Sequence, residues 1–337
     1  MPSGKRFSLL FLLLTLIPVY AIVGYNIWND TSGLFNTDFS VPRPEPSQHF
    51  IKMRYLIENP DKYDAYCFGS SRVGNIDLKK IEDGHRYYNM TYAAGVPAEW
   101  RDDLILLLRH HVTIHKILIG LDDLSFREDP TPHKKDLVRV PYQENNLKTY
   151  LTFLFRTPSK PYRFTRPPKG DYEYMHHSIY DIYDSGRPLH DAPDKRIEAN
   201  LEGHRIKVAN SVAGIDYPYY RQGKIFPYRV PQALEELQEI KNLCDENSIE
   251  LIVFINPHSA HEYEFTDPDR FSEFRQGLAK ITDYYDFSGF NEITTNDYYF
   301  YEWSHYRPIA GDLIIHRIFE MPKEAETDFG RYVKQEQ

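Results

Sequence analysis

The amino-terminal segment 7–27 constrains this chain most, because it contains no charged residue. A run of about 20 apolar residues is long enough to cross the hydrocarbon core of a bilayer. Lys5 and Arg6 precede the run, and positive charge tends to stay on the cytoplasmic side of a membrane. We therefore expect residues 1–28 to be a single-pass membrane anchor, with the soluble part of the chain periplasmic or extracellular.

A cleaved signal peptide is the alternative interpretation of this segment. Its apolar region would span about 7–15 residues and end in an Ala-x-Ala-like site. The run found here is longer, and its best small residue, Ala21, follows Tyr20. The pattern favours an uncleaved anchor. A buried core helix is disfavoured because the segment is apolar all round.

The composition of the whole chain is that of a folded, non-basic protein. Of its 337 residues, 41% are hydrophobic and 26% are charged, with a formal net charge of −9. The hydrophobic content argues against a disordered chain, and the negative charge argues against broad contact with nucleic-acid phosphates. Two cysteines, Cys67 and Cys244, are too few for a disulfide framework.

Strand and helix patterns alternate through two parts of the chain, 49–126 and 231–325. Short apolar runs predict strands at 63–71, 86–95, 114–126, 249–257 and 284–289. Amphipathic helical patterns lie at 50–60, 97–111, 231–247 and 267–281. This alternation predicts βαβ units and therefore an α/β domain with a mostly parallel sheet.

Three segments do not follow the alternation. Segment 29–48, rich in Asp, Ser, Thr and Pro, is predicted to be a linker. Segment 127–230 is rich in Pro, Tyr, Arg and His and too long for a plain loop, so we expect an irregular insertion or cap. We expect residues 326–337 to be a flexible tail.

Neither a cofactor site nor a metal site is expected. The chain has no dinucleotide fingerprint and no Walker-type loop. His111 and His115 are four residues apart, which suits two ligands on a helix, but the intervening residues favour strand entry and no third ligand is evident.

Two loops that combine glycine with polar residues follow the first and third predicted strands. They are GSSR at 69–72 and GLDD at 120–123. In an open parallel sheet, ligands bind beyond the carboxyl ends of the strands, where the winding direction reverses. The loops would face each other there. A serine pair after a strand is more often a helix cap than a nucleophile, so this loop alone decides nothing.

Near the carboxyl end, Glu302 lies three residues before His305 and just ahead of a predicted helix. A carboxylate at this spacing can hold one imidazole tautomer. The imidazole can then accept a proton from a serine hydroxyl. The pair therefore predicts a partner serine in the loop at 69–72.

Together these blocks resemble the SGNH hydrolase superfamily, also called GDSL-type esterases. More narrowly, they resemble its membrane-anchored members associated with acylation of cell-envelope polysaccharides, such as the alginate O-acetyltransferases and the D-alanine transfer protein of teichoic acids. The resemblance implies a three-layer sandwich around a flavodoxin-like, five-stranded sheet. It covers the sheet blocks and not the insertion.

The resemblance assigns a triad. The family's Gly-Asp-Ser block corresponds to 69–71, which makes Ser71 the nucleophile. The Asp-x-x-His block corresponds to 302–305, with His305 as the base and Glu302 as the carboxylate that orients it. Glu replaces the family's Asp and can orient a histidine in the same way.

The resemblance also assigns the oxyanion hole. Gly95 matches the glycine that donates a backbone N–H, and the Gly-x-Asn-Asp block matches 120–123. Asp122 stands where an asparagine amide should donate, and an ionised carboxylate would repel an oxyanion. Asp122 would then be rotated away, protonated or paired with Arg72 or another cation, or the site has lost its chemistry.

The implied activity is that of a membrane-anchored, extracytoplasmic serine acyltransferase or acyl esterase acting on O-acyl groups of cell-envelope or exported polysaccharide. We expect Arg72 and Asp123 to contact the substrate. The expected partners are a polysaccharide or acyl-carrying substrate and a membrane O-acyltransferase, with no nucleic acid.

Two alternatives remain. One is a catalytically inactive fold of the same shape that binds glycan or scaffolds a polysaccharide export or modification complex. The other is a phosphate-binding flavodoxin-like domain that uses the loop GSSRVGN at 69–75, in which Glu302 and His305 would have no role.

Overall fold

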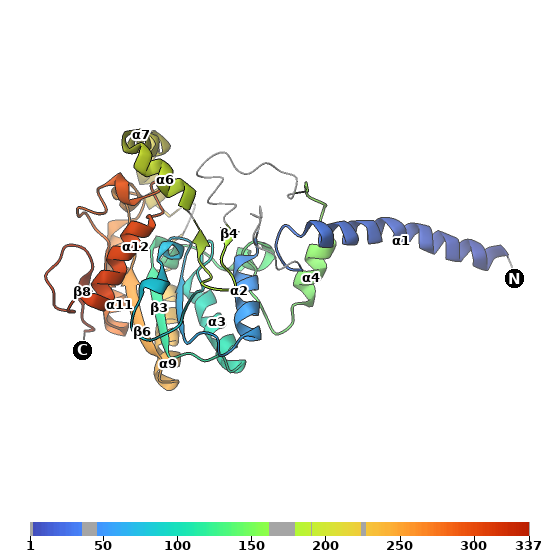
Figure 1. Cartoon of the computed structure of the whole chain (residues 1–337), viewed down its shortest axis with the longest axis horizontal. Helices are drawn as coiled ribbons and strands as arrows, with labels where there is room; N and C mark the ends of the chain where they lie inside the picture. Colours follow the sequence, from blue (N-terminus) through green and yellow to red (C-terminus); the bar gives the residue numbers. More distant parts are fainter. Residues whose placement is uncertain (1–2, 36–45, 162–178, 190, 224–226, 337) are drawn as a thin grey trace.

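A computed structural model describes residues 3–35, 46–161, 179–189, 191–223 and 227–336. Helix α1 (Ser3–Asn29) extends away from the rest of the protein (Figure 1). Its stretch Leu10–Asn29 is long and apolar enough to cross a membrane, and nearly all of that stretch is exposed. The predicted long apolar helix at the amino terminus is therefore present.

The rest of the chain is organised around a sheet with the strand order β2-β1-β3-β6-β7-β8. The strands are β1 (Ala65–Gly69), β2 (Tyr87–Asn89), β3 (Lys116–Leu121), β6 (Glu250–Ile255), β7 (Tyr284–Asp286) and β8 (Arg331–Val333). Neighbouring strands from β2 to β7 are parallel, whereas β8 pairs antiparallel with β7. The prediction of an α/β fold with a mostly parallel sheet is confirmed.

The sheet has six strands rather than five, and the additional strand lies in the segment expected to be a flexible tail. β8 pairs along the edge of β7 and supplies partners for backbone groups that would otherwise stay open. The ring of Tyr332 packs at 5.1 Å from that of Tyr285. Sequence patterning missed β8 because its residues lie among polar ones, form no apolar run and are not fully buried.

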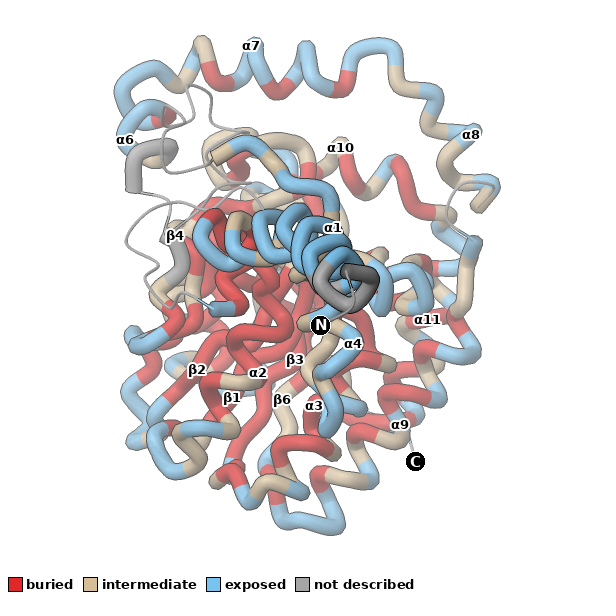
Figure 2. Tube along the Cα trace, turned by 90° about the vertical axis from the view of Figure 1, so that its right-hand side faces the viewer, coloured by how far each residue is buried: buried red, intermediate tan, exposed pale blue. Residues whose placement is uncertain are grey.

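Both faces of the sheet are buried, which explains why its strands are continuous apolar runs rather than alternating ones. In β3, Ile117 and Ile119 join one core cluster, whereas Leu118 joins the other. The first cluster lies against helices α2 (Gln48–Glu58), α3 (Pro97–Arg109), α9 (Val230–Glu246) and α11 (Pro268–Ile281). The second lies against α12 (Pro308–Ile315). Figure 2 shows the strands buried beneath the exposed outer turns of the helices.

The two ends of the insertion 127–230 lie next to each other, because the N–H of Arg229 donates to the carbonyl of Phe126 at 2.8 Å. Its described parts are less irregular than expected. They contain the hairpin β4 (Ile179–Tyr180) and β5 (Pro188–Leu189), and helices α4 (Leu147–Leu154), α6 (Asp191–Ala199), α7 (Leu201–Val212) and α8 (Tyr217–Arg221). Residues 162–178, 190 and 224–226 of the insertion lie outside the described residues.

The segment 29–48 is not a free linker where it is described. Residues 29–34 are buried, and Ser47 N–H donates to the carbonyl of Ser32 at 2.9 Å. These backbone groups satisfy one another inside the fold, so the end of α1 is fixed to the domain. Residues 36–45 of the predicted linker lie outside the described residues.

Candidate active site

Strands β1 and β3 are neighbours in the sheet. From β1 the chain continues to β2 on one side, and from β3 it continues to β6 on the other, so the winding direction reverses between them. Gly69 ends β1 and is paired with Gly120 of β3. A Cβ atom on Gly69 would meet the Val73 side chain at 2.5 Å, and one on Gly120 would meet it at 2.4 Å. Two glycines are therefore needed for the chain to turn sharply after β1, and this turn carries Ser70 and Ser71.

The structure brings Ser71, His305 and Glu302 together at this edge, although Ser71 and His305 are 234 positions apart. Ser71 Oγ lies 2.8 Å from His305 Nε2, and His305 Nδ1 lies 2.6 Å from Glu302 Oε1. With a proton on Nδ1 donated to Glu302, Nε2 is left as the acceptor for the serine hydroxyl proton. This is the order of groups that activates a serine nucleophile.

The loop before α12 holds the histidine and its carboxylate in place. Glu302 accepts from the backbone N–H of Ser304 at 2.8 Å and from that of His305 at 2.7 Å. Burial alone would raise the pKa of Glu302. The charge of His305 and these hydrogen bonds have a larger effect in the opposite direction, so the pKa lies below its ordinary value. The carboxylate is therefore charged at neutral pH and can accept the Nδ1 proton of His305.

The backbone N–H groups of Ser71 and Gly95 lie at or beside the turn that carries Ser70 and Ser71. Within the described residues, Ser71 N–H makes no backbone hydrogen bond. Gly95 packs against this turn, since a Cβ atom there would meet the Gly69 carbonyl oxygen at 2.8 Å. Its own N–H makes a long bond of 3.3 Å to the carbonyl of Tyr92. Gly95 is therefore close to the site, with its donor turned to a weak local bond.

Asp122 is buried and its oxygens act as acceptors. It caps the 3₁₀ turn Asp123–Phe126 by accepting from Leu124 N–H at 3.1 Å, and it accepts from Ser70 Oγ at 2.5 Å. Arg72 Nη1 lies 2.9 Å from its Oδ2. Pairing with Arg72, one of the arrangements anticipated for this carboxylate, is thus the one observed. Asp122 therefore offers acceptors at the position where the resemblance implies an asparagine amide that donates to the oxyanion.

Arg72 and Asp123 are paired with protein groups, and their expected contact with the substrate stays a prediction. Arg72 is 4% exposed, and its Nη1 lies 2.9 Å from Asp123 Oδ1. Its Nε donates to Ser304 Oγ at 3.1 Å, and its Nη2 pairs with Glu262. A buried guanidinium needs such partners, and these ones join the nucleophile turn to the histidine loop.

Two further residues of this cluster, Glu262 and His258, were not predicted. Burial raises the pKa of Glu262 well above its ordinary value, although the charge of Arg72 acts in the opposite direction. Burial also lowers the pKa of His258, and neither of its ring nitrogens has a hydrogen-bond partner in the described part of the chain. The one sequence feature that pointed to such residues is the arginine beside the serine pair, because a guanidinium buried there needs acidic partners from other segments.

No protein-family model matches the chain, and no curated protein sequence matches it. The chemistry must therefore be argued from the arrangement itself. A serine, a histidine and a carboxylate in hydrogen-bonded series can transfer an acyl group through a covalent intermediate.

Proposed function

We propose that this protein is a membrane-anchored serine acyltransferase or acyl esterase of the SGNH type, acting outside the cytoplasm on O-acyl groups of cell-envelope or exported polysaccharide. The observation that carries the proposal is the chain of hydrogen bonds from Ser71 through His305 to Glu302. Its position at the carboxyl edge of the central strands is where α/β sheets bind ligands.

In the proposed reaction, Ser71 Oγ attacks the carbonyl carbon of an ester while its proton passes to His305 Nε2. The Ser71 N–H donates to the oxygen that becomes negative. Collapse of the tetrahedral intermediate breaks the bond to the alcohol, which takes the proton from His305, and leaves an acyl-serine. Water then releases the acyl group in an esterase, and a sugar hydroxyl accepts it in a transferase.

The strand order supports the superfamily. From β2 to β7 the sheet follows the flavodoxin-like order that the resemblance implies for a three-layer sandwich, with β8 as an addition at the edge. The apolar clusters on both faces of the sheet are consistent with helical layers on each side.

Aromatic side chains from the insertion support a carbohydrate substrate. Trp303, between the two loop residues of the triad, packs at 4.8 Å from the ring of Phe265. Phe265 in turn contacts Tyr217 at 4.8 Å and Tyr220 at 5.2 Å, both from α8. The insertion thus adds the partly exposed rings of Tyr217 and Tyr220 to an aromatic cluster that reaches Trp303 in the histidine loop, and such rings combine an apolar face with a polar edge, as sugars require.

Helix α1 supports the anchored location, because its apolar stretch has the length and exposure of a bilayer-spanning helix. A reporter that is active only outside the cytoplasm, fused after Asn29, is expected to be active. A silent reporter alongside an active cytoplasmic one would reverse the proposed orientation.

A second candidate function is a catalytically inactive relative that binds glycan or scaffolds an export complex. The observation in its favour is the incomplete oxyanion hole. Asp122 accepts hydrogen bonds instead of donating one, and the Gly95 N–H is directed to Tyr92. Removing one oxyanion donor costs about 10²–10³ in rate.

Labelling by a fluorophosphonate probe distinguishes the two. We expect the full chain in detergent to be labelled, the Ser71→Ala variant to be unlabelled, and the Ser272→Ala variant, changed on the remote helix α11, to be labelled like the wild type. Folding of each variant is checked by its melting temperature. Absence of labelling in well-folded wild type would favour the inactive relative.

A further inference from the structure

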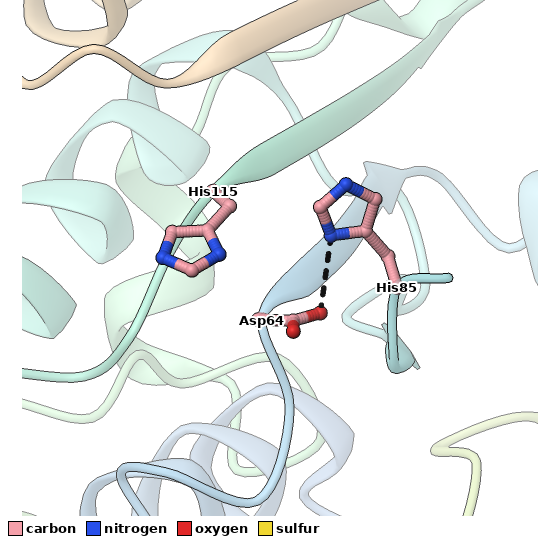
Figure 3. Close-up of side chains that lie close together, drawn as sticks. All are labelled: Asp64, His85 and His115. Atoms are coloured by element: carbon pink, nitrogen blue, oxygen red, sulfur yellow. Dashed lines mark ion pairs between the residues drawn. The ribbon is translucent and has the colours of Figure 1, made fainter. Parts of the chain in front are cut away.

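Three side chains with metal-binding atoms meet at the amino end of the sheet, opposite the end that carries Ser71 (Figure 3). Asp64 directly precedes β1, His115 directly precedes β3, and His85 lies in the turn before β2. One ligand atom of each lies within 4.8 Å of the other two. The i, i+4 pair noted in the sequence is not the relevant one, because His115 meets His85 across strands.

The sheet itself places these residues. The N–H of His115 donates to the carbonyl of Asp64 at 2.8 Å, and the N–H of Asp64 donates to the carbonyl of Arg86 at 3.1 Å. The Arg86 N–H also donates to Asp64 Oδ1 at 2.7 Å, which orients the carboxylate. Ligands fixed by strand register and by such supporting bonds need little reorganisation when an ion binds.

The protein groups that could compete with a metal ion for these ligand atoms interact with them only weakly. Arg86 Nη2 lies 3.7 Å from Asp64 Oδ2, but its side chain is 59% exposed, and an exposed pair of this kind contributes little. His85 Nδ1 lies 3.4 Å from Asp64 Oδ1. The ring of His115 is exposed and, within the described residues, makes no hydrogen bond, so solvent ions can reach it.

We propose that Asp64, His85 and His115 bind one divalent transition-metal ion. Two imidazole nitrogens and one carboxylate oxygen are the ligand types that suit Zn²⁺, with water in the fourth position. The ion would link the starts of three neighbouring strands, β2, β1 and β3. It lies at the opposite end of the strands from the triad, so its effect is on stability rather than on acyl transfer.

Calorimetric titration of the EDTA-treated full chain with Zn²⁺ tests this site. We expect one ion per chain, a raised melting temperature, and at least a tenfold weaker affinity in the His115→Ala variant, with unchanged melting in EDTA. His111 has a φ of +56°, so its control is His111→Asn, which tolerates that backbone and is expected to bind like the wild type. Equal binding by wild type and His115→Ala, or no binding by either, would overturn the proposal.

A second, independent observation concerns the surface where α1 meets α4. Leu147, Leu151 and Phe155 are 61%, 43% and 58% exposed and follow at intervals of four residues, so they form one stripe along α4. Phe153 on the other side of the helix is buried in the core. Amphipathic helices with an exposed apolar stripe of this kind bind membrane interfaces.

The end of α1 is bound directly to α4 and the residues after it. Asn26 Nδ2 donates to the carbonyls of Leu154 at 2.9 Å and Arg156 at 3.0 Å, and Tyr25 Oη donates to the carbonyl of Ser159 at 2.6 Å. In Figure 1 α4 runs across the direction of α1, and it does so again in Figure 2, where α4 faces the viewer on the side from which α1 projects.

We infer that the α4 stripe Leu147, Leu151 and Phe155 is embedded in the lipid headgroup region beside the anchor. The inference rests on the proposed membrane anchor, since a helix that runs across the direction of a spanning helix at its end can lie along the bilayer surface. Trp28, 47% exposed at the end of α1, is an aromatic residue of the kind enriched at that depth. The soluble domain is thereby held against the membrane instead of being tethered at a distance.

Quenching by spin-labelled lipids in nanodiscs tests this surface, because Cys67 and Cys244 are buried and a single introduced cysteine can carry a fluorophore. We expect quenching at Leu151→Cys and at Ile17→Cys within α1, and none at Glu273→Cys on α11. Quenching at Ile17→Cys but not at Leu151→Cys would contradict the placement of α4 in the headgroup region and would leave the proposed anchor unaffected. Quenching at neither position would overturn the anchor as well.

Discussion

The guanidinium of Arg72 lies 2.9 Å from the carboxylate of Asp122, and both side chains are almost wholly withdrawn from solvent. Arg72 belongs to the turn after β1, and Asp122 follows β3, so the pair spans the point where the winding of the sheet reverses. Because the charge of Asp122 is compensated, a carboxylate where the resemblance implies an asparagine does not place an unpaired charge beside Ser71.

Replacing Arg72 by Met is expected to destabilise the protein strongly. The change removes the cation from buried Asp122 and leaves Asp123 with Arg127 alone, at 3.5 Å, and breaking a buried pair from one side costs about 3–5 kcal/mol. Unfolding of the full chain in detergent measures this. The control is Arg101→Met, whose partly exposed pair with Glu239 contributes about 1 kcal/mol or less. Equal losses in the two variants would show that the cluster has no special role.

Replacing Glu302 by Gln is expected to slow acylation of Ser71 by about 10²–10⁴-fold, because the amide no longer stabilises the imidazolium and can enforce the wrong tautomer. The rate of fluorophosphonate labelling measures the effect. Glu320→Gln is a matched control, since Glu320 forms an exposed pair with His316 at 2.8 Å. Labelling of Glu302→Gln at the wild-type rate would remove Glu302 from the mechanism.

His133 is expected to make stability depend on pH. Burial lowers its pKa, but hydrogen bonds to Glu128 and Glu99 raise it more, to about 9 from an ordinary value of 6.5. A raised pKa stabilises the fold below pH 6.5, by an amount on the order of 3 kcal/mol, and this contribution is lost as pH rises from 6.5 to 9.

The measurement for His133 is the difference in unfolding free energy between wild type and His133→Gln across that range. The difference is needed because buried Lys52, whose pKa burial lowers to about 7, acts in the opposite direction in the wild-type curve. The advantage of the wild type should shrink toward pH 9. A constant difference would contradict the assignment.

Replacing Gly95 by Ala is expected to perturb the nucleophile turn. The added Cβ would lie 2.8 Å from the Gly69 carbonyl oxygen and 2.9 Å from Trp100 Nε1, and overpacking of this kind costs about 1–3 kcal/mol. We expect a lower melting temperature and slower labelling of Ser71. Gly24→Ala, where nothing lies within 4 Å, should change neither. A Gly95→Ala variant that labels normally would separate this glycine from the site.

Much of the fold could be predicted from local pattern. The long uncharged run forms α1, and the apolar runs at 114–126 and 249–257 contain β3 and β6. Pro97 lies in the first turn of α3, as its missing N–H favours. These features could be predicted because the hydrophobic periodicity of helices and strands, and the restricted backbone of proline, depend on only a few neighbouring residues.

Apart from Asp122, the partners of Arg72 could not be predicted in this way. Glu262 comes from a short helix 190 positions away, and nothing in its neighbourhood marks it as a buried acid. The strand β8 and the contact of His85 with His115 have the same origin, because each depends on how separate segments register against the sheet.

The amino-acid order alone predicted the long apolar amino-terminal helix and the alternating α/β domain, since short-range periodicity carries that information. Motif spacing pointed to Glu302 and His305 with a serine in the loop at 69–72, and the family resemblance selected Ser71 as their partner. Folding supplied the rest. Parallel strand pairing brought Ser71 within hydrogen-bonding distance of His305, and burial of Arg72 required its acids to gather beneath them. Long-range contacts of this kind are set by strand register and by the cost of leaving buried charges unpaired. Neither can be deduced from a short stretch of sequence.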